Sequence, residues 1–444
     1  MTALHQPARA EGPPRPPARV PFPVVDEVAR HCLQEEEPET VHIEVHLPGR
    51  LDAGRLRTAF AEALRRHPRI LMREVPGRWY RRRYEWELTA EPDVEVVSFP
   101  APGRDALREA RTRALAEAPP LSLSPPIRVE VVEKAGPVEP RTSHGTVLFL
   151  TINHTALDGP ACLRVLATAS ELYGGQDNSP VAPPVRTAPA APPPPEDTPS
   201  NWSRPARVAQ GTPEPSPGNG MLVTELPLPH RPKGSPYTVN DQLMVTTALT
   251  IAHWNREHGA RPRPLRITMP VDDRPRDATM PIGNGTRLVE VPFTVDELAV
   301  HDPGRMPALL HRTATRTRAL KALPRPQLGH GASLLTAPWA PVAVRAALTR
   351  GLRRAAAPWT STTLLSNIGR IPYPLDFGAE AGRAHAVWFS APARMPRGLT
   401  VTTASTAGRL HLALRWSRAL LSHGDGTHLR DLFEHYLHTT EVTP

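Results

Sequence analysis

The chain has 444 residues, of which 22% are charged, with a formal net charge of +9 and only two cysteines. This length favours two domains over a single hydrophobic core, and two cysteines cannot form a disulfide framework. The longest apolar run, at 147–152, is far shorter than the roughly 20 residues of a membrane-spanning helix, so we expect no membrane partner.

Arginine supplies almost all of the positive charge, because Lys134, Lys233 and Lys321 are the only lysines. Together with abundant Ala and Pro, this bias is typical of a GC-rich genome. The segment WYRRRYEW at 79–86 comes closest to a nucleic-acid-binding pattern, but its alternation favours a strand with one solvated face. We therefore expect no nucleic-acid partner, whereas a basic surface would attract an acidic protein.

The first half of the chain is expected to form one domain over residues 21–177. Residues 1–20 lack the apolar segment of a secretory signal and are predicted to be a disordered tail of a cytoplasmic protein. Apolar and polar residues alternate at 39–49, as in a half-buried strand, and the helical pattern that follows ends before Pro68. Later patterns predict strands at 125–133 and 146–152 and a helix at 159–175.

A proline-rich linker is predicted at 178–220, because prolines cannot continue a helix or sit inside a sheet. The second domain, 221–444, begins with a long helix that Asn240 or Asp241 would cap. Both halves mix strands and helices, which predicts an α/β fold. The remaining predicted elements of this domain are strands at 264–271, 286–295 and 361–369, a hairpin at 398–417 that turns at 407–408, and helices at 341–354 and 426–440.

His154 lies in the turn between the buried strand at 146–152 and the helix at 159–175. One interpretation is structural: Asp158 caps the helix and His154 bonds the loop. The other is catalytic, because a neutral imidazole can take a proton from an attacking hydroxyl or amine, and such turns often line clefts. Cys162 falls within the helix and is expected to pack in the core.

The segment NHTALDG at 153–159 resembles the H-H-x-x-x-D-G signature of the chloramphenicol-acetyltransferase-like superfamily, which includes condensation domains and polyketide-associated acyltransferases. Asn153 replaces the first histidine of the signature. Further segments follow the order used by that family, so the resemblance covers the chain from about Phe22 to Leu437. These segments are GRLDAGRLRTAFAEALRRHPRI, YTVNDQLMVTTALTIA, MPVDDRPRDATMPIGN and LLSNIGRIP.

The resemblance implies two acetyltransferase-like halves in a V-shaped pseudo-dimer with a central tunnel. It implies that His154 is the general base, and that Asp158 and Gly159 support the site. Arg274 of the second half matches the arginine that pairs with the motif aspartate. We expect Asn153, Ser366 and Asn367 to be candidates for oxyanion or substrate positioning, with no metal site.

The implied function is stand-alone acyl transfer from a thioester to a hydroxyl or amine acceptor in natural-product biosynthesis. The donor would be coenzyme A or the phosphopantetheine arm of an acyl or peptidyl carrier protein, and we expect no intrinsic cofactor and a monomer. Two alternatives stay open. The fold could cyclise or rearrange a carrier-bound intermediate, or it could be a scaffold that binds carrier proteins without catalysis.

Overall fold

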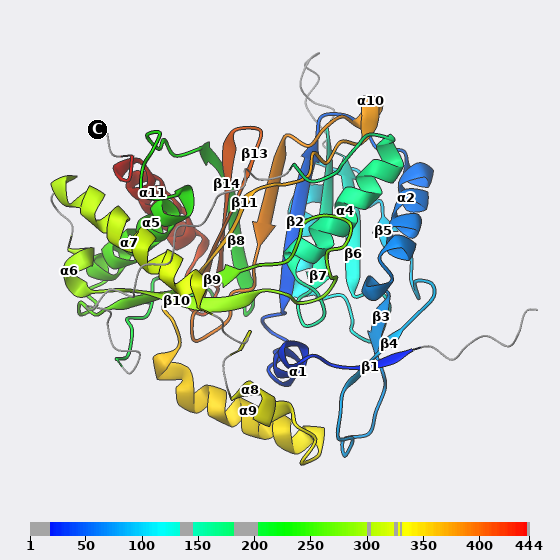
Figure 1. The fold of residues 1–444 in the computed structure, drawn as a ribbon, viewed down its shortest axis with the longest axis horizontal. Coiled ribbons are helices and arrows are strands. Elements are labelled where there is room, and N and C mark those ends of the chain that lie inside the picture. Colours follow the sequence, from blue (N-terminus) through cyan, green and yellow to red (C-terminus); the bar gives the residue numbers. More distant parts are fainter. Residues whose placement is uncertain are drawn as a thin grey trace, which may run out of the picture.

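The computed structural model describes residues 18–133, 145–181, 203–299, 303–323, 327–328 and 331–441. Within these residues the fold is mixed α/β, as predicted, with three β-sheets. The two larger sheets lie side by side, and most helices cover their outer faces (Figure 1). Nearly all of the predicted tail and residues 182–202 of the predicted linker lie outside the described residues.

The first large sheet carries the strand that leads to His154. Helices α2 (Ala53–Arg66) and α4 (Gly159–Gly174) pack against one face of this sheet, and α3 (Ala106–Ala116) lies against it near Val132 and Val147. Its strand order is β12-β2-β7-β6-β5. The strands are β2 (Thr40–Leu47), β5 (Val97–Ser98), β6 (Ile127–Glu133), β7 (Thr146–Asn153) and β12 (Ala386–Ser390).

Strand β2 is buried on both faces, so the prediction of a half-buried strand was wrong. Its polar residues face α3, where Arg111 donates to both carboxylate oxygens of Glu44, at 2.8 and 2.6 Å. A bidentate arginine satisfies a buried carboxylate. The alternating pattern of β2 therefore reflects one face of apolar residues and one face of buried, ion-paired polar residues.

The second large sheet has the order β10-β9-β11-β13-β14-β8. The predicted hairpin is confirmed: β13 and β14 pair around Ala407 and Gly408, which both have positive φ angles (50° and 76°). The strands are β8 (Asn219–Pro227), β9 (Leu265–Val271), β10 (Arg287–Phe293), β11 (Thr363–Arg370), β13 (Leu399–Thr406) and β14 (Arg409–Ser417), and the helices that pack here are α5 (Val239–Glu257), α7 (Met306–Ala322) and α11 (His423–Thr439).

Helix α5 begins two or three residues earlier than expected, because Thr238 is its N-cap and Asp241 completes a capping box with it. The linker prediction also extends too far. Ala206 and Val208 are buried in the core of the second half, and β8 already begins at Asn219.

Strand β12 belongs to the second half of the sequence but pairs antiparallel with β2 of the first half. Trp388 on this strand donates from Nε1 to Thr224 O of β8 at 2.9 Å, so the strand also contacts the other large sheet. The division into domains at 21–177 and 221–444 remains a prediction, and β12 crosses it.

A third, three-stranded sheet lies at one end of the first half, next to three helices (Figure 1). The predicted strand at 79–86 is largely wrong: only 85–88 is a strand, and residues 76–80, 82 and 83 are exposed in a loop. The sheet consists of β1 (Arg19–Pro21), β3 (Met72–Glu74) and β4 (Glu85–Leu88), and the nearby helices are α1 (Val24–His31), α8 (Ala332–Thr336) and α9 (Val342–Ala356). The shorter α-helices are α6 (Val295–Leu298) and α10 (Gly378–Ala381).

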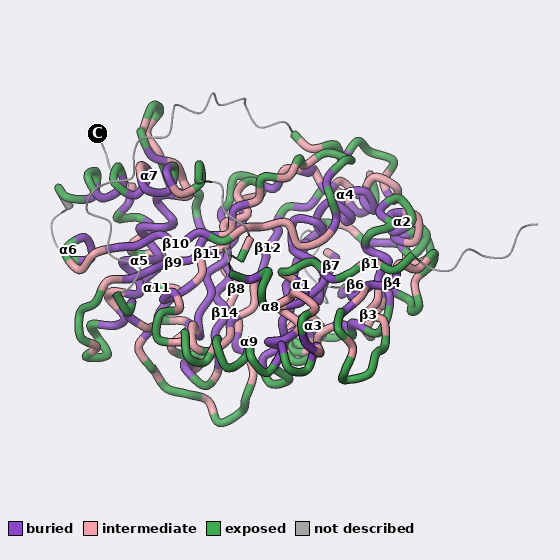
Figure 2. Tube along the Cα trace, turned by 60° about the horizontal axis from the view of Figure 1, so that its bottom comes forward, coloured by how far each residue is buried: buried purple, intermediate pink, exposed green. Residues whose placement is uncertain are grey.

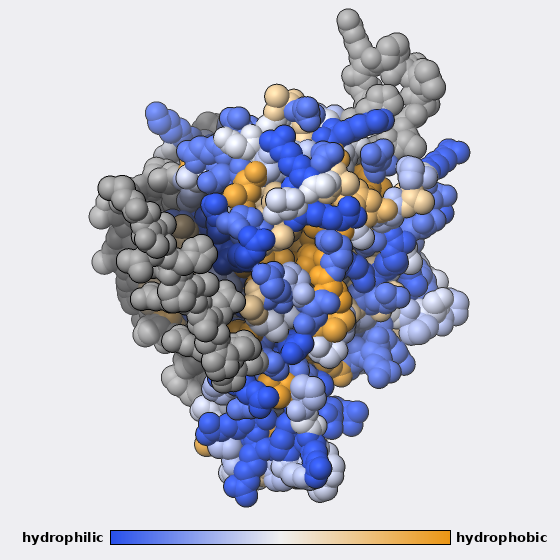
Figure 3. Space-filling view, turned by 90° about the vertical axis from the view of Figure 1, so that its right-hand side faces the viewer, coloured by the Kyte–Doolittle hydropathy of each residue, from blue (hydrophilic) through white to orange (hydrophobic). Residues whose placement is uncertain are grey.

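The outer surface of the first half is mainly hydrophilic, with a narrow hydrophobic strip near the middle of the face (Figure 3). Within the described ranges, none of the helices combines the length and the apolar character needed to span a bilayer.

Candidate active site

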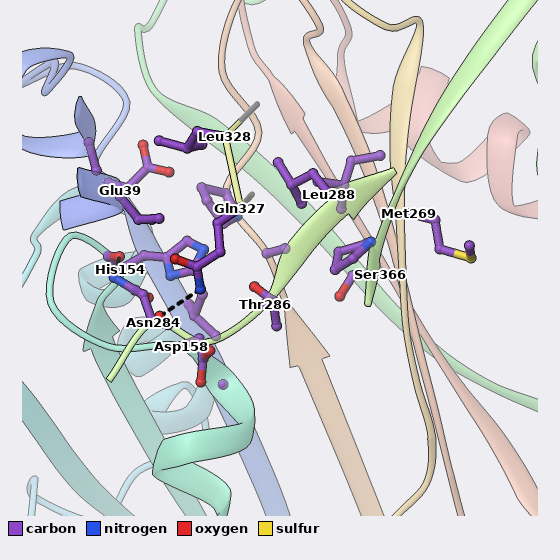
Figure 4. Close-up of a pocket in the computed structure, with 18 of the residues that line it drawn as sticks. Glu39, His154, Asp158, Met269, Asn284, Thr286, Leu288, Gln327, Leu328 and Ser366 are labelled. Atoms are coloured by element: carbon purple, nitrogen blue, oxygen red, sulfur yellow. Dashed lines mark hydrogen bonds between the residues drawn. The ribbon is translucent and has the colours of Figure 1, made fainter. Parts of the chain in front are cut away.

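A cavity of about 880 Å³ lies between the two large sheets, and residues from both halves of the sequence line it (Figure 4). Its volume falls in the range typical of small-molecule sites. Lining residues of the first half include Glu39, His154 and Gly159, and those of the second half include Met269, Asn284 and Ser366.

His154 follows directly on β7, and its own loop holds it in place. Its backbone N–H donates to Glu39 O at 2.8 Å, and its ring Nδ1 lies 3.0 Å from Leu157 O. A carbonyl oxygen can only accept, so Nδ1 carries a proton, and in the neutral ring the lone pair lies on Nε2. A general base that acts through Nε2 requires this neutral tautomer.

Asp158 has both structural roles that the sequence analysis considered, the cap of α4 and the ion pair with Arg274. Its Oδ1 accepts from Ala161 N at 3.0 Å and caps α4. Its Oδ2 accepts from Arg274 Nη2 at 2.6 Å and from Gly285 N at 2.8 Å. The buried carboxylate therefore ties the His154 turn to a loop of the second half.

Every N–H group of the Arg274 guanidinium donates a hydrogen bond. Nε and Nη2 also bond Asp272, and Nη1 donates to Pro281 O at 3.1 Å and Gly283 O at 3.0 Å. Burial alone would lower the pKa of Arg274, but its bonds to Asp272 and Asp158 hold that pKa above its usual value. A lysine has no equivalent fork, so the loop depends on arginine at this position.

Two glycines allow close approaches around the site. A Cβ on Gly159 would lie 3.2 Å from the ring of Phe389, which lines the cavity from β12. A Cβ on Gly285 would lie 2.3–2.5 Å from the Arg274 guanidinium. Gly159 was expected to support the site, whereas the need for Gly285 was not recognised from the sequence.

Asn284 and Asp26 are two further residues that sequence reasoning missed. Asn284 Nδ2 lies 3.1 Å from both His154 O and Thr155 O and 2.9 Å from Asp26 Oδ1, and Figure 4 shows Asn284 close to His154. Burial raises the pKa of Asp26 to about 6. Among the described residues, Asn284 Oδ1 has no hydrogen-bond partner, although it is buried at the cavity wall.

The three residues expected to position an oxyanion or substrate are separated by the fold. Ser366 and Asn367 on β11 line the cavity, and Ser366 lies on the wall opposite His154 (Figure 4). The Asn367 side chain is already engaged by Asn240, Gly369 and Thr403. Ser366 is thus the better candidate of the two.

Asn153 has a different position from the one expected. Its Nδ2 donates to Pro119 O at 2.8 Å and its Oδ1 accepts from Thr155 N at 3.1 Å. It is buried and does not belong to the cavity lining. Because both ends of the amide serve the turn, Asn153 is a structural residue, and the expectation of substrate contact is corrected.

The cavity wall also carries several cationic side chains. Arg394 pairs with Glu39, and burial lowers the pKa of Arg397 to about 10, which leaves it charged at neutral pH. The cations in the lining are Arg276, Lys321, Arg353, Arg394 and Arg397. Cys162 is buried in α4, and burial raises the pKa of its thiol well above the usual value, so it is unsuited to nucleophilic attack.

No protein-family model matches the chain. An uncharacterized protein of Mycobacterium tuberculosis, Rv2305, is 29% identical over 400 residues, which cover 80% of this chain and 84% of that protein. Three solved structures superpose on nearly the whole chain. Trichothecene 15-O-acetyltransferase from Fusarium sporotrichioides has a TM-score of 0.64 at 11% identity, covering 96% of both chains.

The other two structures are condensation domains. The starter condensation domain of rhizomide synthetase, in complex with C8-CoA, has a TM-score of 0.61 at 13% identity and 95% coverage of both chains. The first condensation domain of the CDA synthetase has a TM-score of 0.58 at 14% identity and 96% coverage of both. The chain therefore has the same fold as these acetyltransferase and condensation-domain structures.

Proposed function

We propose that this protein is an acyltransferase of the condensation-domain type, which moves an acyl group from a thioester to a hydroxyl or amine acceptor. The observation that carries the proposal is the contact of His154 Nδ1 with Leu157 O at the wall of the cavity. In the neutral ring this contact leaves the lone pair on Nε2, free to accept a proton.

In this mechanism the acceptor transfers its proton to His154 Nε2 as its oxygen or nitrogen attacks the thioester carbonyl. The new bond produces a tetrahedral oxyanion. When this intermediate collapses, the carbon–sulfur bond breaks, and the departing sulfur takes the proton back from His154. The histidine acts first as base and then as acid, so no covalent acyl-enzyme is required.

Donors near the cavity support stabilisation of the oxyanion. The Ser366 hydroxyl lies on the wall opposite His154, and Gly159 lies at the positive end of α4. One preorganised donor of this kind contributes roughly 3–4 kcal/mol to transition-state stabilisation. Asn284 Oδ1 adds a buried acceptor for a substrate N–H or O–H.

We propose a thioester of coenzyme A or of an acyl or peptidyl carrier protein as the donor. The fold neighbour from rhizomide synthetase binds C8-CoA. The cations of the cavity wall, Arg353 and Arg397 among them, would complement the phosphates of either donor. Natural-product biosynthesis is the proposed setting.

An intact-mass assay tests this function directly. Purified protein is incubated with acyl-CoA thioesters, acyl-loaded carrier proteins and a panel of small hydroxy and amino acceptors. We expect a product heavier than the acceptor by one acyl group. His154→Ala should reduce the rate roughly 10²–10⁴-fold, whereas His428→Ala, at an exposed site on α11, should not.

The other outcomes distinguish the alternatives. A product with the same mass as the carrier-bound intermediate would show that the protein cyclises or rearranges that intermediate and does not transfer an acyl group. Binding of a loaded carrier with no chemistry in the wild type would favour a scaffold instead.

A further inference from the structure

Helix α9 presents its larger apolar residues beyond its first turn to solvent and buries two of its polar ones. Val344, Leu348 and Leu352 recur every four residues on its exposed side. Arg345 and Thr349, each one position further along, are buried, and Arg345 is 0% exposed. A surface helix of a globular protein normally has the reverse arrangement.

The buried side of α9 holds this arrangement rigidly. Arg345 Nη1 pairs with Glu27 of α1, its Nη2 donates to Arg82 O at 2.6 Å, and its Nε donates to Ala340 O at 3.2 Å. Thr349 Oγ1 lies 3.3 Å from His31 Nδ1 of α1. Because these bonds fix the rotation of α9, its apolar side cannot turn inward.

The loop between β3 and β4 extends the same face. Its segment at 76–83, PGRWYRRR, contains Trp79 at 73% exposure and the exposed Tyr80. The loop contacts α9 directly, because Val342 N donates to Arg81 O at 2.8 Å. Both project from the lower side of the molecule in Figure 1, and Figure 2 shows α9 exposed along much of its length.

The charged residues of α8, α9 and the loop segment 76–83 are all basic. No Asp or Glu occurs at 303–375 or at 76–83. Arg78, Arg82, Arg83, Arg350 and Arg354 are exposed around the apolar residues. Leucines beside arginines, with Trp and Tyr among them, are the composition of an element that lies in the interface of an anionic bilayer.

We propose that this face, formed by Trp79, Tyr80, Leu334, Val344, Leu348 and Leu352, docks onto the surface of an anionic lipid bilayer. Leu334 on α8 is 72% exposed and would enter the bilayer with the α9 leucines. An interfacial helix needs no membrane-spanning segment, so the proposal revises our expectation of no membrane partner. It does not depend on acyl transfer.

The docking face lies next to the cavity, which gives membrane docking a functional role. Leu335, Leu352 and Arg353 of α8 and α9 also line the cavity. A bilayer held against α9 would therefore lie beside one mouth of the cavity. A substrate with a long acyl chain would reach the cavity from the lipid without crossing water.

Vesicle flotation of the full chain tests the proposal. We expect the protein to float with vesicles of phosphatidylcholine and phosphatidylglycerol in equal parts, and to bind phosphatidylcholine alone weakly. Leu348→Glu combined with Leu352→Glu should weaken partitioning at least about tenfold. The matched control, Leu228→Glu with Val181→Glu, changes two exposed apolar residues on other elements and should bind as the wild type does.

A charge variant separates the electrostatic contribution to vesicle binding from the hydrophobic one. Arg82→Glu with Arg354→Glu should remove the preference for phosphatidylglycerol, because each cation near an anionic surface strengthens binding. The proposal is overturned if the wild type fails to float, or if the double leucine variant floats equally well. It is also overturned if an acidic carrier protein, or a second copy of the chain detected by light scattering, occupies this face instead of vesicles.

Discussion

Replacing Asp158 by asparagine should destabilise the fold while leaving the chemistry of His154 intact in the folded fraction. The substitution can keep the oxygen that caps α4, but it turns Oδ2 into an NH₂ group. That group would face two donors, Arg274 Nη2 at 2.6 Å and Gly285 N at 2.8 Å in the wild type. Asp158 is buried, so water cannot compensate.

The size of the loss follows from these two bonds. Both bonds end on the charged carboxylate, and each hydrogen bond to a charged group contributes roughly 1.5–3 kcal/mol. Asp158→Asn should therefore lower the free energy of unfolding by about 3–6 kcal/mol. Asp158→Ala also removes the cap and should lose about 1 kcal/mol more.

Urea unfolding followed by tryptophan fluorescence measures this difference. The matched control is Asp273→Asn, because Asp273 also pairs with an arginine, at 2.9 Å, but its side chain is 69% exposed. A pair whose carboxylate is exposed to water should contribute less than about 1 kcal/mol. If Asp158→Asn stays within about 1 kcal/mol of the wild type and still loses activity as severely as His154→Ala, then Asp158 takes part in the chemistry and our structural assignment fails.

Three further predictions concern the surroundings of the site. Gly285→Ala should displace the Arg274 guanidinium, which a Cβ would approach within 2.3–2.5 Å, and should lower the urea midpoint; an unchanged midpoint would contradict the contact. Gly159→Ala should push the Phe389 ring into the cavity and raise KM for the donor, so kinetics with unaltered KM would argue against this packing. Burial raises the pKa of Asp26 from 3.8 to about 6 in the folded state. Between these pH values the native state binds more protons than the unfolded state. The contribution of Asp26 to the free energy of unfolding therefore falls as pH rises. The difference in unfolding free energy between wild type and Asp26→Asn should shift by about 2 kcal/mol against the wild type from pH 4 to pH 7, and a difference independent of pH would refute the raised pKa.

The local features of the site could be predicted from the sequence because they depend on neighbouring residues. The buried strand before His154, the helix after Asp158 and the hairpin at 407–408 all follow from periodicity and turn residues. The cap of α5 carried a readable signal as well, since Thr238 stands three residues before Asp241.

The contacts that were missed join residues that are distant in the sequence. Asn284 bonds Asp26 across 258 positions and His154 across 130. The amide could not be distinguished from an ordinary loop asparagine until the two halves were placed together. The face of α9 was missed because its sequence pattern shows an amphipathic helix without showing which side is buried.

The pairing of β12 with β2 has a consequence for the order of folding. Val41 and Ile43 are synthesised more than 340 residues before Phe389, which pairs with Ile43. Until the ribosome has released β12, one edge of β2 has no neighbouring strand, and an unpaired edge invites association with other chains. The first sheet therefore remains incomplete through most of translation, and the His154 turn acquires its Phe389 wall only when the second half is nearly complete.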